Sequence, residues 1–379
     1  MSILKRKQTV GAKIEVTEGT AIAIAGADIF PCYDVQFSGD TPSIENENLS
    51  SSMSKSQDIP GRTFGTLTFK CYQYGASAAG SAPFWGKLLQ ACAYSETISA
   101  GVSVTYGRIS SGIKSLTMKR FMDGKSWQIV GARGNVSRDV EAGGLPVLSF
   151  SFQGIWDPIN DVDATKDEAL LVGTALPTFD PKPFKNANLT IGGSFLAVTN
   201  SLNWDAGNSL ANVPDANTTA YKRVDITDRS PSGSFDTESV LKAAHDFEDE
   251  VGQKTPIEIK SFIGSEASGN GTGTLNTMTD TGKNWPASKW ASGFKVIDSA
   301  GAIFTPTAST ATTLTVSGTP ASGNYSVYQD GRLITETIPK AQFQSQDEGD
   351  SDGRATDSYP FMMKKNAAVG DDEQTIVVQ

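Results

Sequence analysis

The sequence predicts a mainly β protein, in which sandwich- or barrel-forming sheets carry one α-helix per domain. Apolar and polar residues alternate along residues 148–153, which read Leu-Ser-Phe-Ser-Phe-Gln. This period of two is typical of a strand with one buried face. The chain has 37 glycines among 379 residues and is rich in Ser and Thr, which favours strands and turns over long helices. The same order of segments occurs twice, which predicts a domain duplicated in tandem.

Length, charge and cysteine content narrow the class of protein. A chain of 379 residues is too long for one comfortable core, so two or three domains are expected. A net charge of −10 argues against a general nucleic-acid binder and against adhesion to anionic membranes. Cys32, Cys71 and Cys92 are odd in number and widely spaced, which indicates buried free thiols. With no secretory segment and no long apolar run, we expect synthesis in a cytoplasm and solubility until assembly.

The first domain is expected to occupy residues 1–157. Its basic start, Lys5-Arg6-Lys7, is either an assembly arm or a frayed terminus. A helix is predicted over residues 84–93, whose apolar side chains share one helical face. A hairpin over residues 131–156 completes the domain, with Gly143-Gly144 at its reversal. Strands are predicted at residues 22–29, 33–37, 66–71, 102–108, 115–121 and 126–130, the last two joined by the hairpin turn Asp123-Gly124.

Residues 39–57 form a long polar segment within this domain. Ile44, Leu49 and Met53 are its sparsely spaced apolar residues. A loop of this length is either disordered or ordered by a partner. The segment leads into an arginine-bearing turn, Ile59-Pro60-Gly61-Arg62.

Residues 158–185 are expected to be a linker, because four prolines in this acidic stretch block strand continuation. The second domain, residues 186–264 and 331–379, repeats the order of the first. It has early strands, a polar loop at 208–219 and an arginine-bearing turn that ends at Arg229. A helix over residues 240–251 and a hairpin over 333–363, with a polar tip at 345–353, follow.

Residues 265–330 have no counterpart in the first domain. The segment is low in charge and rich in Gly, Thr, Ser and Ala, with several short apolar-alternating runs. These features predict a small all-β module inserted at an exposed loop tip, from which it should project outward.

Few residues suggest chemistry. His245 is the only histidine, and without a Cys or His cluster it indicates a partly exposed structural role. Residues 347–353 are acidic but lack the twelfth-position acid and flanking helices of a calcium loop, which favours a solvated hairpin tip. Trp285 and Trp290 could form a sugar platform, although core filling is the more common use of aromatics in small β modules. The sequence therefore indicates neither an enzyme nor a cofactor.

Several motifs together resemble a known family. They are Lys13-Ile14-Glu15 with Gly19-Thr20, the hairpin residues 131–137 and 144–150, residues 226–234, residues 349–354, and Gly370-Asp371-Asp372-Glu373. This set resembles the tail tube (major tail) protein of long-tailed bacteriophages, in the form with two fused tube domains. The resemblance covers most of residues 1–264 and 331–379. The inserted segment departs from it and resembles the decoration domains of some tail proteins.

The resemblance implies a structural, non-enzymatic protein of the virion tail, assembled in the host cytoplasm. Trimeric, pseudo-hexameric rings would stack into a tube whose channel conducts the genome during ejection. Its partners would be other copies of itself, the tape measure protein, the tail terminator and distal tail or baseplate proteins. Double-stranded DNA would pass through the lumen without specific binding, which suits an acidic protein.

Candidate self-assembly residues lie in the polar segment, the arginine-bearing turns and the two hairpins. They are Ile44, Leu49, Met53, Ile59, Arg62, Arg133, Arg138, Arg229, Asp350, Asp352 and Arg354. An alternative is a tail-associated adhesin that binds receptors through residues 265–330. A secreted carbohydrate-active enzyme is a third possibility, against which the missing signal peptide and catalytic constellation argue.

Overall fold

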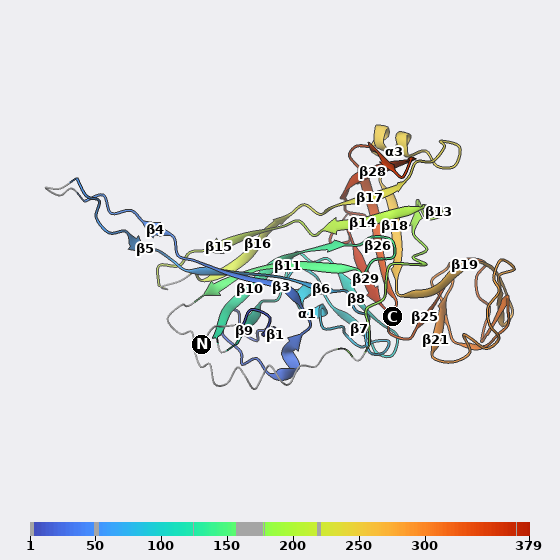
Figure 1. Ribbon diagram of the computed structural model, residues 1–379, viewed down its shortest axis with the longest axis horizontal. Coiled ribbons are helices and arrows are strands. Elements are labelled where there is room, and N and C mark those ends of the chain that lie inside the picture. The colour runs from blue at the N-terminus through green and yellow to red at the C-terminus, as the bar shows by residue number, and fades with distance from the viewer. Residues whose placement is uncertain are drawn as a thin grey trace.

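The computed structural model describes residues 4–48, 53–123, 125–156, 177, 179–217, 221–368 and 370–379. The chain is mainly β, as predicted, with antiparallel pairing throughout the described ladders. Figure 1 shows a long central body, a thin arm at one end and a separate group of strands at the other.

The first half of the chain forms one twisted antiparallel sheet. Its order is β2 (Ile29–Phe30), β1 (Gln8–Ile14), β9 (Leu116–Met122), β10 (Lys125–Asp139), β11 (Val147–Trp156), β6 (Phe64–Tyr72) and β3 (Tyr33–Asp40). The hairpin predicted at residues 131–156 is confirmed as β10–β11. The β9–β10 hairpin is confirmed as well, since Met122 pairs with Lys125.

The second half repeats this strand order. Its sheet runs β13 (Phe195–Leu196), β12 (Thr190–Ile191), β18 (Ile257–Ile263), β26 (Ile334–Phe343), β28 (Arg354–Met363), β17 (Ser232–Glu238) and β14 (Thr199–Asp205). Taken in chain order, each strand has the same neighbours as its counterpart in the first half. One more strand, β27 (Asp347–Ser351), pairs with β28 and extends the line of β26.

Each half also carries a hairpin arm and one short α-helix at matching places in the chain. The arms are β4 (Ser43–Ile44) with β5 (Ile59–Pro60), and β15 (Asn208–Val213) with β16 (Arg223–Arg229). The helices are α1 (Gly86–Gln90) and α3 (Phe247–Gln253). A shared topology with the same accessories indicates that one unit occurs twice.

Two strand pairings join the halves. β14 of the second half pairs with β10 of the first, and β29 (Thr375–Val378) lies between β26 and β8 (Ser103–Gly107), which in turn pairs with β7 (Thr97–Ser99). A single cluster of buried apolar side chains contains residues of both halves, from Val10 to Val378. The halves therefore fold onto one another as a continuous structure.

Residues 265–329 form a smaller sheet of their own. Its order is β22 (Ile303–Phe304), β21 (Phe294–Ile297), β25 (Gly323–Gln329), β19 (Ser265–Thr274), β20 (Thr277–Thr279), β24 (Thr313–Val316) and β23 (Pro306–Ser309). A separate core holds Trp285 and Trp290, which are 8% and 2% exposed, so the prediction that they fill a core is confirmed. This group lies between β18 and β26, where the first half has only the β9–β10 turn.

Several predicted elements were wrong. Residues 208–219 are not simply a loop, because 208–213 form β15. The polar tip at 345–353 contains β27, and Asp352 and Gly353 both have positive φ; an Asp-Gly pair makes the tight turn of a two-residue hairpin. Residues 22–25 form no strand.

Both helices are shorter than predicted. α3 begins at Phe247 rather than at 240, since the side chain of Asp246 accepts a hydrogen bond from the Asp249 amide and caps the helix there. Leu241 is 81% exposed, so the apolar pattern that suggested the longer helix does not reflect burial. Most of the predicted apolar face around α1 is buried, including Leu88 within the helix and Trp85 immediately before it.

Candidate assembly interface

The seam between the two halves is an antiparallel ladder. Ser137 lies opposite Asp205 and Arg138 opposite Trp204, and an isolated bridge joins Glu141 to Ser201. Backbone hydrogen bonds connect further pairs at both ends of the ladder: Ala206 N to Val136 O, Leu202 N to Val140 O and Ala142 N to Asn200 O. The seam thus shows how the edge of one unit docks on the sheet of the next.

A buried ionic contact lies under this ladder. Arg138 is 0% exposed and pairs with Glu336 of β26, which is 2% exposed. The guanidinium also donates to Leu202 O at 3.0 Å, and Gln374 donates to Glu336 at 2.6 Å. Burial raises the pKa of Glu336 and the Arg138 charge opposes this rise. The pair therefore connects β10, β14 and β26 through groups that are costly to separate.

Three further arginines hold the second half against the first. Arg108 donates to Ala206 O at 3.0 Å, and Arg133 donates to Val224 O at 2.7 Å. Arg229 donates to Ile109 O at 2.8 Å and forms ion pairs with Asp371 and Glu373.

The outer edges of the chain are open. Among the described residues no strand pairs with the free side of β3 or of β27. All five residues of β27 are exposed, and β3 is exposed at most positions. Unpaired edges of this kind are templates for pairing with another chain.

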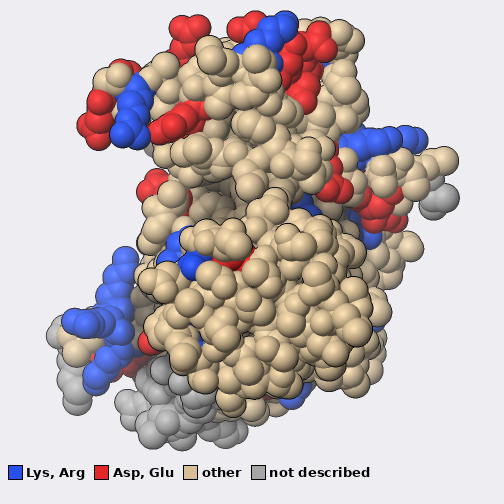
Figure 2. All heavy atoms as spheres, turned by 90° about the vertical axis from the view of Figure 1, so that its right-hand side faces the viewer, with Lys and Arg blue, Asp and Glu red and all other residues tan. Residues whose placement is uncertain are grey.

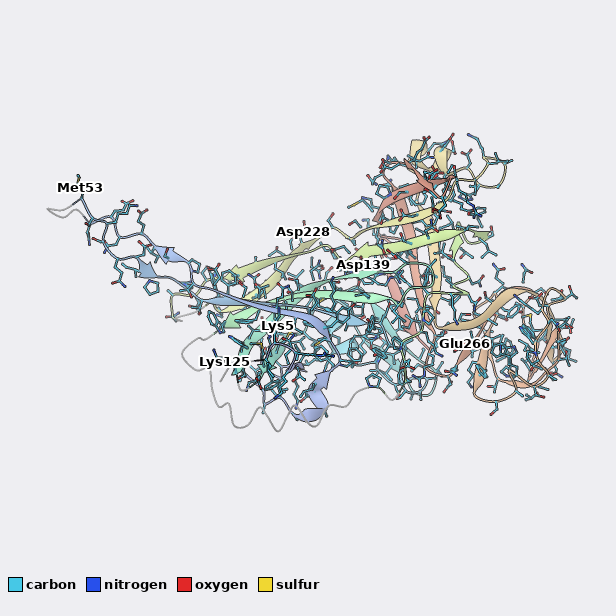
Figure 3. The ribbon with its side chains drawn as sticks, in the orientation of Figure 1. Lys5, Met53, Lys125, Asp139, Asp228 and Glu266 are labelled. Atoms are coloured by element: carbon cyan, nitrogen blue, oxygen red, sulfur yellow. The ribbon has the colours of Figure 1, made fainter. Side chains whose placement is uncertain are left out.

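The β4–β5 arm projects far from the body (Figure 1), and Met53 lies near its tip (Figure 3). Its apolar side chains contact little, because Ile44 is 58%, Ile59 51% and Met53 98% exposed. Exposed apolar side chains on a thin projection are unfavourable in water, and burial against another surface would remove this cost in free energy.

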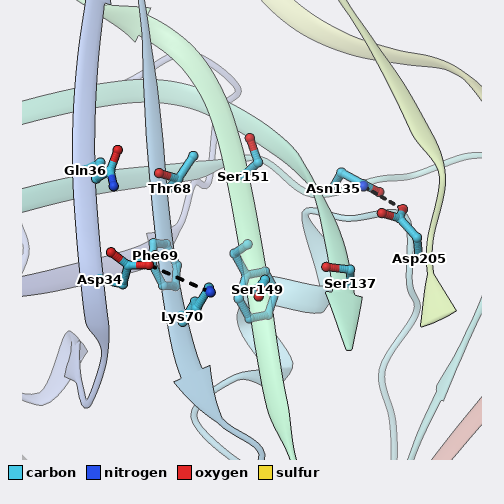
Figure 4. A pocket seen from close by; sticks show the side chains of 11 residues that line it. Asp34, Gln36, Thr68, Phe69, Lys70, Asn135, Ser137, Ser149, Ser151 and Asp205 are labelled. Carbon is cyan, nitrogen blue, oxygen red and sulfur yellow. Dashed lines mark hydrogen bonds and ion pairs between the residues drawn. The ribbon is translucent and has the colours of Figure 1, made fainter. Parts of the chain in front are cut away.

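One face of the body is a shallow polar hollow of about 310 Å³. Figure 4 shows neutral polar side chains along neighbouring strands β3, β6, β11 and β10, with Asp34 and Lys70 paired at 3.8 Å. Asn135 donates to Asp205 at 2.7 Å across the seam. In the second half the same strand face is polar too, since Ser358 donates to Asp236. The sheets therefore have an apolar face toward the core and a continuous polar face outside.

The group of strands at residues 265–329 forms the opposite end of the molecule. Seen from that end, its surface shows few charged side chains, whereas charges gather in the region above it (Figure 2). Its root contacts the body through Lys182 and Glu266, paired at 2.6 Å.

The predicted assembly residues fall into two groups. Arg133 and Arg138 are buried and Arg229 is held by contacts within the chain, so in this structure the three arginines connect the two halves. The other group remains on the outside: Ile44, Met53, Ile59, Asp350, Asp352 and Arg354 are exposed and Arg62 is half-buried. Leu49 and most of the predicted linker at 158–185 lie outside the described residues. Sequence reasoning missed Glu336, Arg108 and Asn208, whose amide donates to Gly134 O of β10 at 3.0 Å, since no local pattern marks a residue that contacts a distant strand.

Other kinds of site find little support. Within the described ranges, no three His, Cys, Asp or Glu side chains are grouped as metal ligands. His245 stacks on Phe195 and lies 3.0 Å from Glu250. Burial raises the pKa of the Cys32 thiol to about 12.

No described helix has the length and apolar character to cross a membrane. No protein-family model and no curated protein matches the chain.

Proposed function

We propose that this chain is the building block of a hollow polymer, the tail tube (major tail) protein of a long-tailed bacteriophage. The observation that carries the proposal is the seam. The second unit, which contains β12–β18 and β26–β28, docks by its edge strand β14 onto β10 of the first unit. The same edge of the first unit, β3, is open.

A repeated docking step closes a ring. If each unit presents one edge to the next, the open edges β3 and β27 must meet edges of neighbouring copies, and rotation about a common axis gives a closed ring. Two units per chain then give a trimer with six quasi-equivalent positions, as the resemblance implies. Rings stack because head-to-tail contacts propagate, and the exposed arm is the element that reaches the neighbouring ring.

The polar sheet face fits the wall of such a channel. Its hydroxyl and amide side chains offer no cluster of cations for phosphate, and Lys70 is paired with Asp34. DNA can pass along such a wall quickly, because each unpaired cation on it would add a salt-dependent attraction to the phosphates. The virion tail, with its terminal, tape measure and baseplate proteins, is the setting in which this channel would conduct DNA.

Electron microscopy of the purified chain tests the proposal. Tubes, or rings with an open centre and threefold or pseudo-sixfold symmetry, support it. A protein that remains a monomer at high concentration, in salt that screens its net charge of −10, would overturn it.

The runner-up is a tail-associated adhesin. The observation that favours it is the protruding group of strands at 265–329, whose end surface is nearly uncharged (Figure 2). Host-cell binding that is lost with this segment, by a trimer that does not stack, would favour the adhesin.

A further inference from the structure

The open edges β3 and β27 occupy the places of the two strands that meet in the seam. β3 corresponds to β14. β3 is the edge strand beside β6, β14 is the edge strand beside β17, and each leads into a hairpin arm. Each also ends its ladder with an aspartate: Asp40 opposite Phe64, and Asp205 opposite Ser232. Asp40 is therefore the counterpart of Asp205.

β27 corresponds to the last part of β10. β10 pairs with β11 up to Asp139 opposite Val147, the last pair before the hairpin reverses. β27 pairs with β28 up to Ser351 opposite Arg354, again the last pair before the turn. Ser351 is therefore the counterpart of Asp139.

The seam fixes a register between these strands. Ser137 faces Asp205, so Asp139, two residues further along, faces Asn203. Leu202 N bonds to Val140 O, which makes the neighbouring Asp139–Asn203 position a non-hydrogen-bonded pair, the kind in which the side chains lie closest.

We infer that β27 of one copy pairs antiparallel with β3 of the next, with Ser351 opposite Ser38. This inference rests on the proposed function and specifies the contact that closes the ring. The occupant of each open edge is thus a second copy of this chain, presenting the other edge.

Charge supports this register. It places the three acids of β27 opposite uncharged residues, since Asp347 faces Pro42, Glu348 faces Thr41 and Asp350 faces Gly39. A shift by one residue would put Glu348 opposite Asp40, and like charges directly opposite one another destabilise a strand pair.

Arg62 gives independent support for a missing neighbour at this edge. It stands just before β6, as Arg229 stands just before β17. Arg229 donates to Ile109 O of the first half and pairs with Glu373 of its own half, whereas Nη1 of Arg62 is buried and has no hydrogen-bond partner among the described residues. A partner copy at β3 would place new acceptors in reach of it.

Disulfide cross-linking tests the pairing. The double variant Ser38→Cys/Ser351→Cys is assembled, oxidised mildly and separated under denaturing, non-reducing conditions. We expect covalent dimers and closed trimers that disappear on reduction, because opposed cysteines of a non-hydrogen-bonded pair fall within disulfide distance. Wild-type protein treated in the same way shows any cross-linking that involves the native cysteines Cys32, Cys71 and Cys92.

The matched control is Ser38→Cys/Asp347→Cys, whose second cysteine lies four residues, about 13 Å, along the same strand. Equal or preferential cross-linking of the control would overturn the register. Tubes or rings that form normally but yield no cross-link in the Ser351 variant would overturn the edge pairing while leaving the proposed function intact. Wild-type protein that never assembles would instead refute the proposed function.

Discussion

Replacing Arg138 by methionine should destabilise the chain strongly. The substitution keeps much of the side-chain volume but leaves Glu336, 2% exposed, without the cation that pairs with it. Breaking a buried ion pair by removing one partner costs about 3–5 kcal/mol, because the remaining charge stays desolvated. The bond from Gln374 to Glu336 remains, so the lower end of this range is expected.

Urea unfolding of the monomer at pH 8, followed by tryptophan fluorescence, measures this loss as a lower midpoint. The matched control is the double variant Arg138→Met/Glu336→Leu. It removes both charges and should recover most of the stability, since a buried pair is often replaceable by apolar residues.

The deficit should also depend on pH. Burial already raises the pKa of Glu336 and Arg138 opposes this, so the pKa rises further in the single variant. A carboxyl whose folded pKa lies above its unfolded value stabilises the fold when protonated, and that contribution is lost as pH rises through the folded pKa. The stability of Arg138→Met relative to wild type should therefore improve from pH 8 to pH 5. A loss below about 1 kcal/mol at pH 8, or a deficit that grows on acidification, would refute the reasoning.

Two further predictions concern the proposed assembly, and a third concerns the contacts of Arg229. Replacing residues 265–330 by a two-residue Asn-Gly turn should leave tubes intact in electron micrographs, since Ser265 and Tyr328 pair at the root of the segment; loss of tubes would show that the segment holds rings together. Met53→Asp should allow rings but shorten stacks, measured as the tube length distribution, because a charge prevents burial of the arm tip; unchanged lengths would show that the tip stays in water. Arg229→Ala should lower the free energy of unfolding by about 1–3 kcal/mol, seen as a lower urea midpoint, through loss of its backbone bond and its two ion pairs; an unchanged midpoint would show that these contacts contribute nothing.

The strands with one buried face were predictable from sequence. The alternation in residues 148–153 and the Asp-Gly hairpin signal depend on local chemistry; β11 forms as expected, and Met122 of β9 pairs with Lys125 of β10. The helix at 240–251 failed for a physical reason. Leu241 is 81% exposed although Val240 packs against the core, and the cap at Asp246 decides where the helix begins.

The seam could not be predicted in the same way. Arginines near turns were expected to serve contacts between copies, yet Arg138 finds its partner, Glu336, almost 200 residues later in the chain. Such pairs depend on how two sheets dock, which local patterns do not encode. The repeat of segments did suggest that two units exist, but only their pairing gives a register for the open edges.

The place of the extra strand group has a practical consequence. The second unit opens its β18–β26 hairpin to carry 265–329, with the two ends of the segment adjacent, whereas the first unit closes the matching β9–β10 hairpin with a short turn. The β9–β10 hairpin is therefore a second position at which this fold could accept an inserted domain. In the proposed tube, a foreign domain with neighbouring termini inserted there would double the number of extra domains that each copy displays.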